Sequence, residues 1–257
     1  MKTANVAEAV KSEHAVALLK QMYGENRVEE NAARYQLVAD GFVKEFGDKA
    51  FEFFSAPGRT EIGGNHTDHN HGKVLAGSVH LDCVAAAAPN GTHTVNLISE
   101  TYNQHLVINL DDLAPTEKTT GTEPLLKGIF AGLLEKGCKV EGFDAYVTSN
   151  VIGGAGVSSS ASFEMLVCAI TNHFFNEGKL EYGEYARAGQ YAENVYWKKA
   201  SGLMDQMACA AGGPILLDFS DKENISCEKI AFSFEDMGYR LVIVNTGKGH
   251  ADLSEEY

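Results

Sequence analysis

The sequence predicts a single α+β domain in which a mixed β-sheet packs against helices. The chain opens with apolar residues at helical spacing, and a stretch rich in branched and aromatic residues follows, as is typical of strands. Helix-like and strand-like segments then alternate. No repeat, low-complexity tract or Pro/Ser-rich linker divides the 257 residues, and an apolar content of 44% is enough for a sizeable core.

The first half of the chain predicts two helices followed by strands. Apolar residues at helical spacing predict helices over 6–22 and 32–46. A short polar connection between the last two predicted strands suits a hairpin. The strands are predicted at 51–56, 74–86, 93–99 and 105–110.

The second half alternates between helical and extended patterns. A polar connector containing Gly121 leads into the first of its helices, which Gly137 ends. Helices are predicted at 124–135, 162–174, 184–197 and 203–211. Strands are predicted at 143–151, 215–219 and 241–244.

Composition excludes several classes of partner. A formal charge of −14 argues against binding to nucleic acid or to an anionic membrane. The five cysteines are widely spaced and form no C-x-x-C pair, so neither a disulfide framework nor a zinc ribbon is indicated. The first residues lack the apolar stretch of a signal peptide, and no run reaches the roughly 18 apolar residues of a membrane span. We therefore expect a cytoplasmic protein with reduced thiols.

The densest group of reactive side chains lies in residues 56–72, which read A-P-G-R-T-E-I-G-G-N-H-T-D-H-N-H-G. Alternating His and Asp side chains can bind a metal ion, and the same groups can pair with sugar hydroxyls. Arg59 would repel a metal ion, and no distinctive cluster elsewhere supplies further ligands, so a metallohydrolase is disfavoured. We expect His69 and His71 to be exposed loop residues.

A glycine- and serine-rich segment, G-G-A-G-V-S-S-S-A-S at 153–162, lies between a predicted strand and a predicted helix. Small residues let the backbone approach an anion, and a helix start offers unpaired N–H groups and a favourable dipole. The segment therefore predicts a phosphate-binding loop. It lacks the Lys-Ser/Thr ending of a P-loop and the order of the dinucleotide fingerprint. A flexible loop with a serine cap is the plainer alternative.

A third segment, S-G-L-M-D-Q-M-A-C-A at 201–210, places Asp205 among small and apolar residues. An unpaired buried carboxylate is costly, so Asp205 needs a partner, which Arg59 can supply. The alternative is that Asp205 only caps or braces a helix.

These three segments, in this order, resemble the GHMP small-molecule kinases, and the first resembles the galactokinase family in particular. The galactokinase signature is close to G-R-x-N-x-I-G-E-H-T-D-Y-x-x-G, the family's phosphate loop reads G-G-G-L-S-S-S-A-S, and its third motif, G-I-M-D-Q, is similar to residues 202–206. The resemblance covers about 53–257 and implies a GHMP-kinase amino-terminal domain, with a fold like domain 2 of ribosomal protein S5, over 1–257.

Within this domain the resemblance implies a galactose-binding signature at about 53–75 and a phosphate-binding loop at about 151–162. We expect the family's carboxy-terminal lobe to be absent from this chain. A catalytic cleft needs both walls to exclude water and to fix the reacting groups, so we expect little or no kinase activity from these 257 residues alone.

The resemblance also implies a reaction, in which galactose and ATP give galactose 1-phosphate and ADP. Asp205 would be the general base for the anomeric hydroxyl, with Arg59 beside it and the transferring phosphate. Ser160 and Glu193 would bind Mg²⁺, although a solvated charge on a helix face is the alternative for Glu193. The ATP phosphates would lie on the backbone of Gly154, Ala155, Gly156, Val157, Ser158, Ser159 and Ser160.

The family's sugar contacts correspond to Asn65, His66, Asp68, the Gly202 backbone and Tyr257. Tyr257 is included because the last eight residues resemble the family's H-S-L-x-x-S-x-Y; a disordered terminal residue is the alternative.

The sequence departs from the galactokinase signature at four positions. Asn65 replaces the family glutamate that contacts the primary hydroxyl, and His69 replaces a tyrosine. Glu61 and Gly63 stand where Asn and Ile are expected. The preferred sugar is therefore open, and galacturonate, arabinose and N-acetylgalactosamine are alternatives to galactose.

The partners that the resemblance implies are a small-molecule sugar and ATP, bound by a monomer. A non-catalytic galactose and ATP sensor on the same scaffold is the alternative from a different functional class, because fold alone does not determine chemistry.

Overall fold

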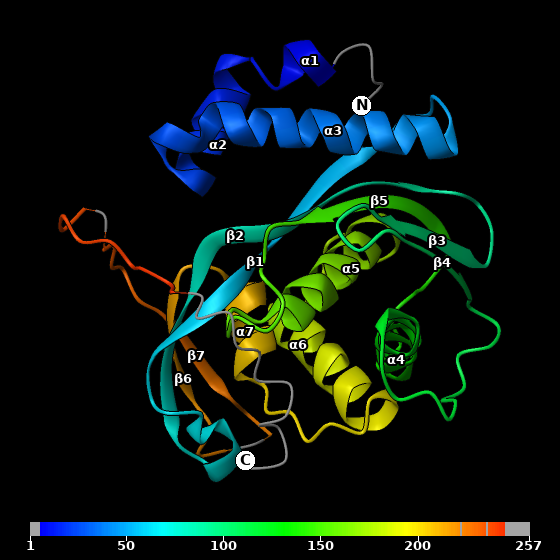
Figure 1. The fold of residues 1–257 in the computed structure, drawn as a ribbon. Coiled ribbons are helices and arrows are strands. Elements are labelled where there is room, and N and C mark those ends of the chain that lie inside the picture. Colours follow the sequence, from blue (N-terminus) through cyan, green and yellow to red (C-terminus); the bar gives the residue numbers. More distant parts are fainter. Residues whose placement is uncertain (1–5, 222, 235, 245–257) are drawn as a thin grey trace.

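The computed structural model describes residues 6–221, 223–234 and 236–244, and its centre is a seven-stranded sheet (Figure 1). The strands are β1 (Glu52–Gly63), β2 (Lys73–Pro89), β3 (Thr94–Ser99), β4 (Gln104–Asn109), β5 (Phe143–Ser149), β6 (Pro214–Asp218) and β7 (Ser226–Lys229). They follow the order β4-β3-β5-β2-β6-β7, with β1 paired to β2. The β3 and β5 pair is parallel and the other described pairs are antiparallel, which confirms the predicted mixed sheet.

Helices lie on both sides of the sheet (Figure 1). One side carries α1 (Val6–Ala9), α2 (Glu13–Tyr23) and α3 (Val28–Phe46), with the short helix η2 (Glu25–Arg27) between the last two. The other side carries α4 (Thr122–Glu135), α5 (Ser159–Phe175), α6 (Tyr182–Tyr191), η4 (Ala192–Tyr196) and α7 (Met204–Ala211). A further one-turn helix, η3 (Thr67–Asn70), follows β1. Within the described ranges, no helix combines the length and the apolar character that crossing a membrane requires.

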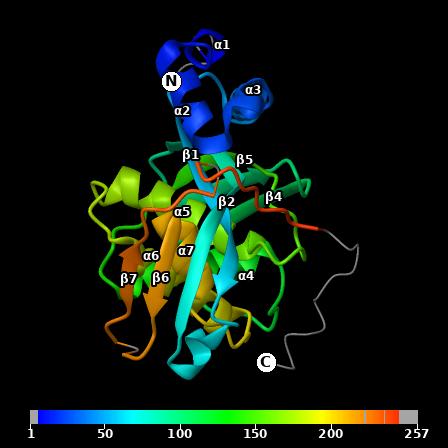
Figure 2. The same cartoon turned by 90° about the vertical axis from the view of Figure 1, so that its left-hand side faces the viewer.

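Strand β2 organises the fold because it is covered on both faces. Along 83–88, odd-numbered side chains pack into the core formed with α4 and α5, and even-numbered side chains pack against α3. Burial on both faces explains why this part of the sequence is almost continuously apolar. One edge of β2 pairs with β1, as Figure 2 shows, and the other edge is shared between β5 and β6.

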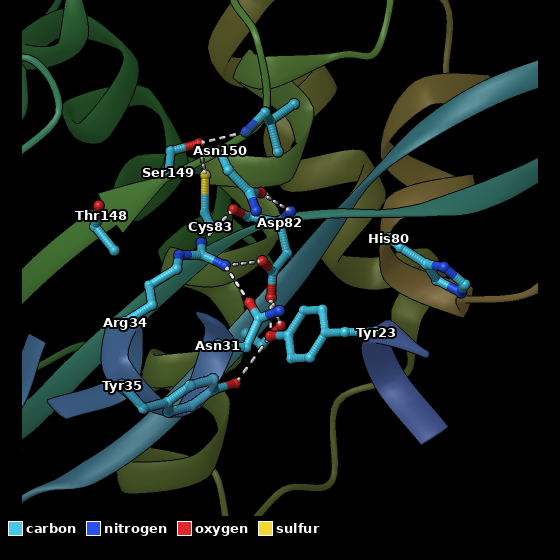
Figure 3. A network of polar contacts seen from close by, with 12 residues as sticks. Tyr23, Asn31, Arg34, Tyr35, His80, Asp82, Cys83, Thr148, Ser149 and Asn150 are labelled. Carbon is cyan, nitrogen blue, oxygen red and sulfur yellow. Dashed lines mark hydrogen bonds and ion pairs between the residues drawn. The ribbon is translucent and has the colours of Figure 1, made fainter. Parts of the chain in front are cut away.

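A buried polar network fixes α2 and α3 to β2 (Figure 3). Its centre is Asp82, which is 3% exposed. The Asp82 carboxylate accepts hydrogen bonds from Tyr23 Oη, at 2.6 Å, and from Ser55 Oγ. Arg34 forms an ion pair with the same carboxylate and donates from Nη2 to the Asp82 carbonyl oxygen at 2.7 Å. Since a buried charge is tolerated only with partners, this network anchors the amino-terminal helices.

Most predicted elements are confirmed, with shifted ends. The strand predicted at 51–56 continues to Gly63, which places Arg59 inside β1 and not in a loop. The helix predicted at 6–22 is two helices, because Ser12 caps the second one by accepting a hydrogen bond from the Ala15 amide.

The prediction of a strand at 241–244 is wrong. These residues form no strand and are exposed, with Val242 and Val244 each 76% exposed. Branched apolar residues satisfy a strand pattern, but a strand also needs a pairing partner, and no described strand pairs with this segment. The converse holds for β7, whose sequence S-C-E-K carries little strand signal but pairs with β6.

Candidate active site

The three segments singled out in the sequence meet at one cavity of about 400 Å³. The end of β1 and η3 form one part of its wall, the glycine-rich loop before α5 forms another, and the start of α7 forms a third. Its lining includes Arg59, His66, Asp68, Glu193, Gly202 and Asp205. The fold therefore brings together residues that lie up to 146 positions apart in the sequence.

Arg59 joins these parts. Its Nε donates a hydrogen bond to Asp205 Oδ1 at 2.8 Å, and its Nη2 lies 2.6 Å from the same oxygen. Nη1 donates to the carbonyl oxygen of Gly156 in the glycine-rich loop at 2.7 Å. The other Asp205 oxygen accepts a hydrogen bond from Ser158 Oγ. The expectation that Arg59 supplies the partner of Asp205 is confirmed, and the pair is bonded to the loop on both sides.

Close packing of β1 on the glycine-rich loop depends on Gly58. A Cβ at this position would lie 2.6 Å from the carbonyl oxygen of Val157, so a side chain there would push the loop away. The Arg59 amide donates to the same oxygen at 3.1 Å. Ser158 then takes a left-handed conformation, with φ 57°, and α5 begins at Ser159. The first amides of this 17-residue helix have no intrahelical acceptors and are suited to an anion.

Glu193 is buried, at 2% exposure, so the alternative that it is a solvated charge on a helix face is wrong. The helix predicted over 184–197 is interrupted here: α6 ends at Tyr191, and η4 is a π-helix in which the Trp197 amide donates to Ala192 O at 3.3 Å. Such single-turn π segments are frequent at functional sites.

The two predicted metal ligands lie together, since Ser160 Oγ donates to Glu193 Oε1 at 2.9 Å. Ser201 Oγ also donates to Glu193, and Lys199 Nζ lies 3.2 Å from both carboxylate oxygens. A hydroxyl and a carboxylate beside a phosphate loop fit Mg²⁺, which takes oxygen ligands and few protein groups. Across the described part of the chain, no three His, Cys, Asp or Glu side chains are grouped to bind a metal ion.

Two predicted sugar contacts, Asp68 and Gly202, are in direct contact. Asp68 is 8% exposed, and its Oδ2 accepts a hydrogen bond from the Met204 amide at the start of α7, at 3.2 Å. A Cβ on Gly202 would lie 1.8 Å from this oxygen, so only glycine fits. Asp68 Oδ1 is buried and accepts no hydrogen bond from the described residues, and the ring nitrogen Nε2 of His69 lies 3.8 Å away.

His66 also lines the cavity, whereas Asn65 is exposed and is not among the lining residues. His69 is exposed as predicted, but it lines the cavity as well. His71 is exposed. Tyr257 lies outside the described residues, so its predicted contact with a sugar stays a prediction.

Two further residues of this region, Lys199 and Glu164, are not among those predicted from the sequence. Lys199 could have been noticed as a cation close to the S-G-L-M-D motif. Glu164 interrupts the apolar stripe of α5, which is a signal of a buried acid. It is fully buried and accepts a hydrogen bond from Gln206 Nε2 at 3.1 Å. Burial raises the pKa of Glu164 well above its ordinary value of 4.5, and the charge of Glu193 raises it further.

Two family descriptions match the chain. The galactokinase galactose-binding signature matches residues 40–89, and the GHMP kinases N terminal domain matches residues 124–213. The first match contains Arg59, His66 and Asp68, and the second contains the glycine-rich loop and Asp205.

Curated relatives and solved structures agree with these matches. Galactokinase from Clostridium tetani is 34% identical over 213 residues, which cover 80% of this chain and 52% of that protein. Galactokinase from Streptomyces coelicolor is 33% identical, covering 86% and 57%. The chain thus spans about half the length of the curated relatives it matches.

The structure of Lactococcus lactis galactokinase complexed with galactose superimposes with a TM-score of 0.69 at 27% identity, covering 78% of this chain and 53% of that one. Mevalonate kinase from Methanococcus jannaschii superimposes with a TM-score of 0.58 at 19% identity, covering 73% and 58%, a likeness that concerns the fold alone.

Proposed function

The chain belongs to the GHMP kinase family and carries the galactokinase signature, and from this premise we propose that its protein transfers the γ-phosphate of ATP to the anomeric hydroxyl of galactose. The observation that carries the proposal is the junction of Arg59, Asp205 and the glycine-rich loop at one cavity. It unites a carboxylate that can accept a proton, a fixed cation and a phosphate-binding backbone.

In the proposed reaction, the anomeric oxygen of the sugar attacks the γ-phosphorus, the bond to the ADP oxygen breaks, and the hydroxyl proton passes to Asp205. Arg59 holds Asp205 through two nitrogens and keeps a positive charge where the transferring group carries negative charge. Positioning and charge neutralisation are the main needs of phosphoryl transfer, and this pair supplies both.

ATP would be bound by the backbone of residues 154–160. Mg²⁺ would be held by Ser160 and Glu193 together with phosphate oxygens, and it would neutralise the phosphate charge. In this chain, Lys199 balances the charge of the buried Glu193 carboxylate.

The free oxygen of Asp68 favours a neutral sugar. A buried acceptor without a donor is costly, and a sugar hydroxyl supplies that donor. A sugar carboxylate at the same place would be repelled by Asp68 and would bring no proton. We therefore expect galactose to be a substrate and galacturonate not to be one.

The test is ADP release by the whole protein with a panel of sugars. Replacing Asp205 with alanine should lower turnover by about 10²-fold or more and leave sugar affinity nearly unchanged. Asp111→Ala is the matched control, because the Asp111 side chain is 70% exposed. Full turnover in D205A, with galactose still bound, would sink the assignment.

The remaining parts of the proposal concern the setting of this activity. We propose that the 257 residues form one amino-terminal kinase domain and have little activity without further residues; the coverage of about half of the relatives supports this. Robust sugar-dependent ADP release by this chain alone would contradict it. We also propose that the protein is a monomer, which size-exclusion chromatography can check. A location in the reducing cytoplasm is supported by the five free cysteines, four of which are buried.

A further inference from the structure

The turn after β1 holds two non-glycine residues in an unfavourable backbone conformation. Asn65 and His66 have φ of 55° and 54°, directly after Gly64 at 127°. Residues other than glycine are uncommon in this left-handed region, and two in succession persist only where surrounding contacts hold them. The turn presents His66 to the cavity, so whatever holds the turn also places this side chain.

Glu61 holds the turn. The His66 amide donates to Glu61 Oε1 at 3.0 Å and to Oε2 at 3.2 Å, and His66 Nε2 lies 3.5 Å from Oε2. Hydrogen bonds to a carboxylate are stronger than neutral ones. The Glu61 side chain is 14% exposed, so solvent competes little for it. One carboxylate thus fixes both the backbone and the ring of His66, although Glu61 itself does not line the cavity.

The neighbouring Asn65 side chain takes no part in this arrangement. Asn65 is exposed and lies outside the cavity lining. Its place in the turn is explained by its tolerance of a positive φ, without any contact to a sugar.

We propose that Glu61 is the residue that positions His66 for the sugar. The inference rests on the proposed function. Glu61 acts through His66, so it is a positioning residue that affects sugar binding and leaves ATP binding alone.

The test compares Glu61→Ala and Glu61→Gln in the whole protein with Glu29→Ala, which removes an exposed glutamate of α3 that lies outside the cavity lining. We expect E61A to raise the KM for the sugar about tenfold or more, the equivalent of about 1.4 kcal/mol, with the KM for ATP unchanged. E61Q keeps an acceptor oxygen and should show a smaller rise. E29A should stay within about twofold of the wild type.

Unchanged sugar KM in E61A and E61Q, or an E29A defect as large as that of E61A, would overturn the inference. If E61A does not fold, E61Q gives the same comparison. A wild-type protein that phosphorylates no sugar would instead overturn the proposed function.

Discussion

Replacing Gly202 with alanine tests whether the contact between α7 and η3 holds the sugar-facing wall together. A Cβ at this position would lie 1.8 Å from Asp68 Oδ2 and 2.6 Å from Asp68 Cγ. The carboxylate has to move by more than 1 Å to reach an ordinary contact distance of roughly 3 Å or more. It then loses its hydrogen bond from the Met204 amide.

The expected cost follows from these contacts. Loss of a hydrogen bond to a charged acceptor costs about 1.5–3 kcal/mol, and overpacking a buried contact costs about 1–3 kcal/mol. The smaller conformational freedom of alanine in the unfolded chain offsets about 0.4–1 kcal/mol. We therefore expect G202A to lower the free energy of unfolding by about 2–5 kcal/mol.

Equilibrium urea unfolding, followed by far-UV circular dichroism, measures this change. Gly63→Ala is the matched control, because a Cβ on Gly63 meets nothing within 4 Å. In a double-mutant cycle, Asp68→Ala should make room for the new methyl group, so the two substitutions together should cost less than their sum by about 1 kcal/mol or more. A G202A protein within about 0.5 kcal/mol of the wild type would refute the reasoning.

Three further predictions concern other parts of the structure. Arg34→Met leaves the Asp82 carboxylate buried without its cation and should lower the free energy of unfolding in urea by about 3–5 kcal/mol. Arg27→Met removes the largely exposed ion pair with Glu30 and should lower it by under about 1 kcal/mol; equal costs of the two substitutions would contradict this. Burial raises the pKa of Glu164, so the folded protein keeps the Glu164 proton, whereas the unfolded chain loses it near pH 4.5. The free energy of unfolding therefore falls as the pH rises above that value. Glu164→Gln removes this dependence, so the melting temperature of the variant should rise relative to that of the wild type between about pH 5 and pH 8; a difference that stays constant would show that Glu164 does not have a raised pKa. Lys199→Met should lower the Mg²⁺ concentration that gives half-maximal activity about two- to fivefold, because the Lys199 ammonium no longer competes with Mg²⁺ for the buried Glu193 carboxylate. An unchanged Mg²⁺ concentration would argue against this competition.

Much of the candidate site follows from the sequence because the types of residue present indicate its chemistry. The phosphate loop is predicted by small residues before a helix, and α5 begins at Ser159 in the structure. The pairing of Arg59 with Asp205 is predicted by charge, since a carboxylate among apolar residues needs a cation nearby. Neither inference requires the topology of the sheet.

The parts that could not be predicted depend on contacts between distant segments. The extension of β1 to Gly63 is set by pairing with β2, and that extension places Glu61 against the turn that follows. The exposed segment 241–244 shows the reverse, because its strand pattern has no partner among the described strands. The π-helical turn at Glu193 leaves no periodic signal that a helix prediction would detect.

That π-helical turn has a consequence for how homologous sequences should be aligned. A π turn corresponds to one residue inserted into an α-helix, and each residue of an α-helix turns the chain by about 100°. Before the insertion, α6 packs closely on α4, where a Cβ on Gly132 would lie 3.3 Å from Ala188 Cα. Inside the π-helical segment, Glu193 accepts a hydrogen bond from Ser160. Deleting one residue at the start of this segment would keep the first contact and rotate the Glu193 carboxylate away from Ser160, so we expect related chains to preserve the length of this segment even where its residues differ.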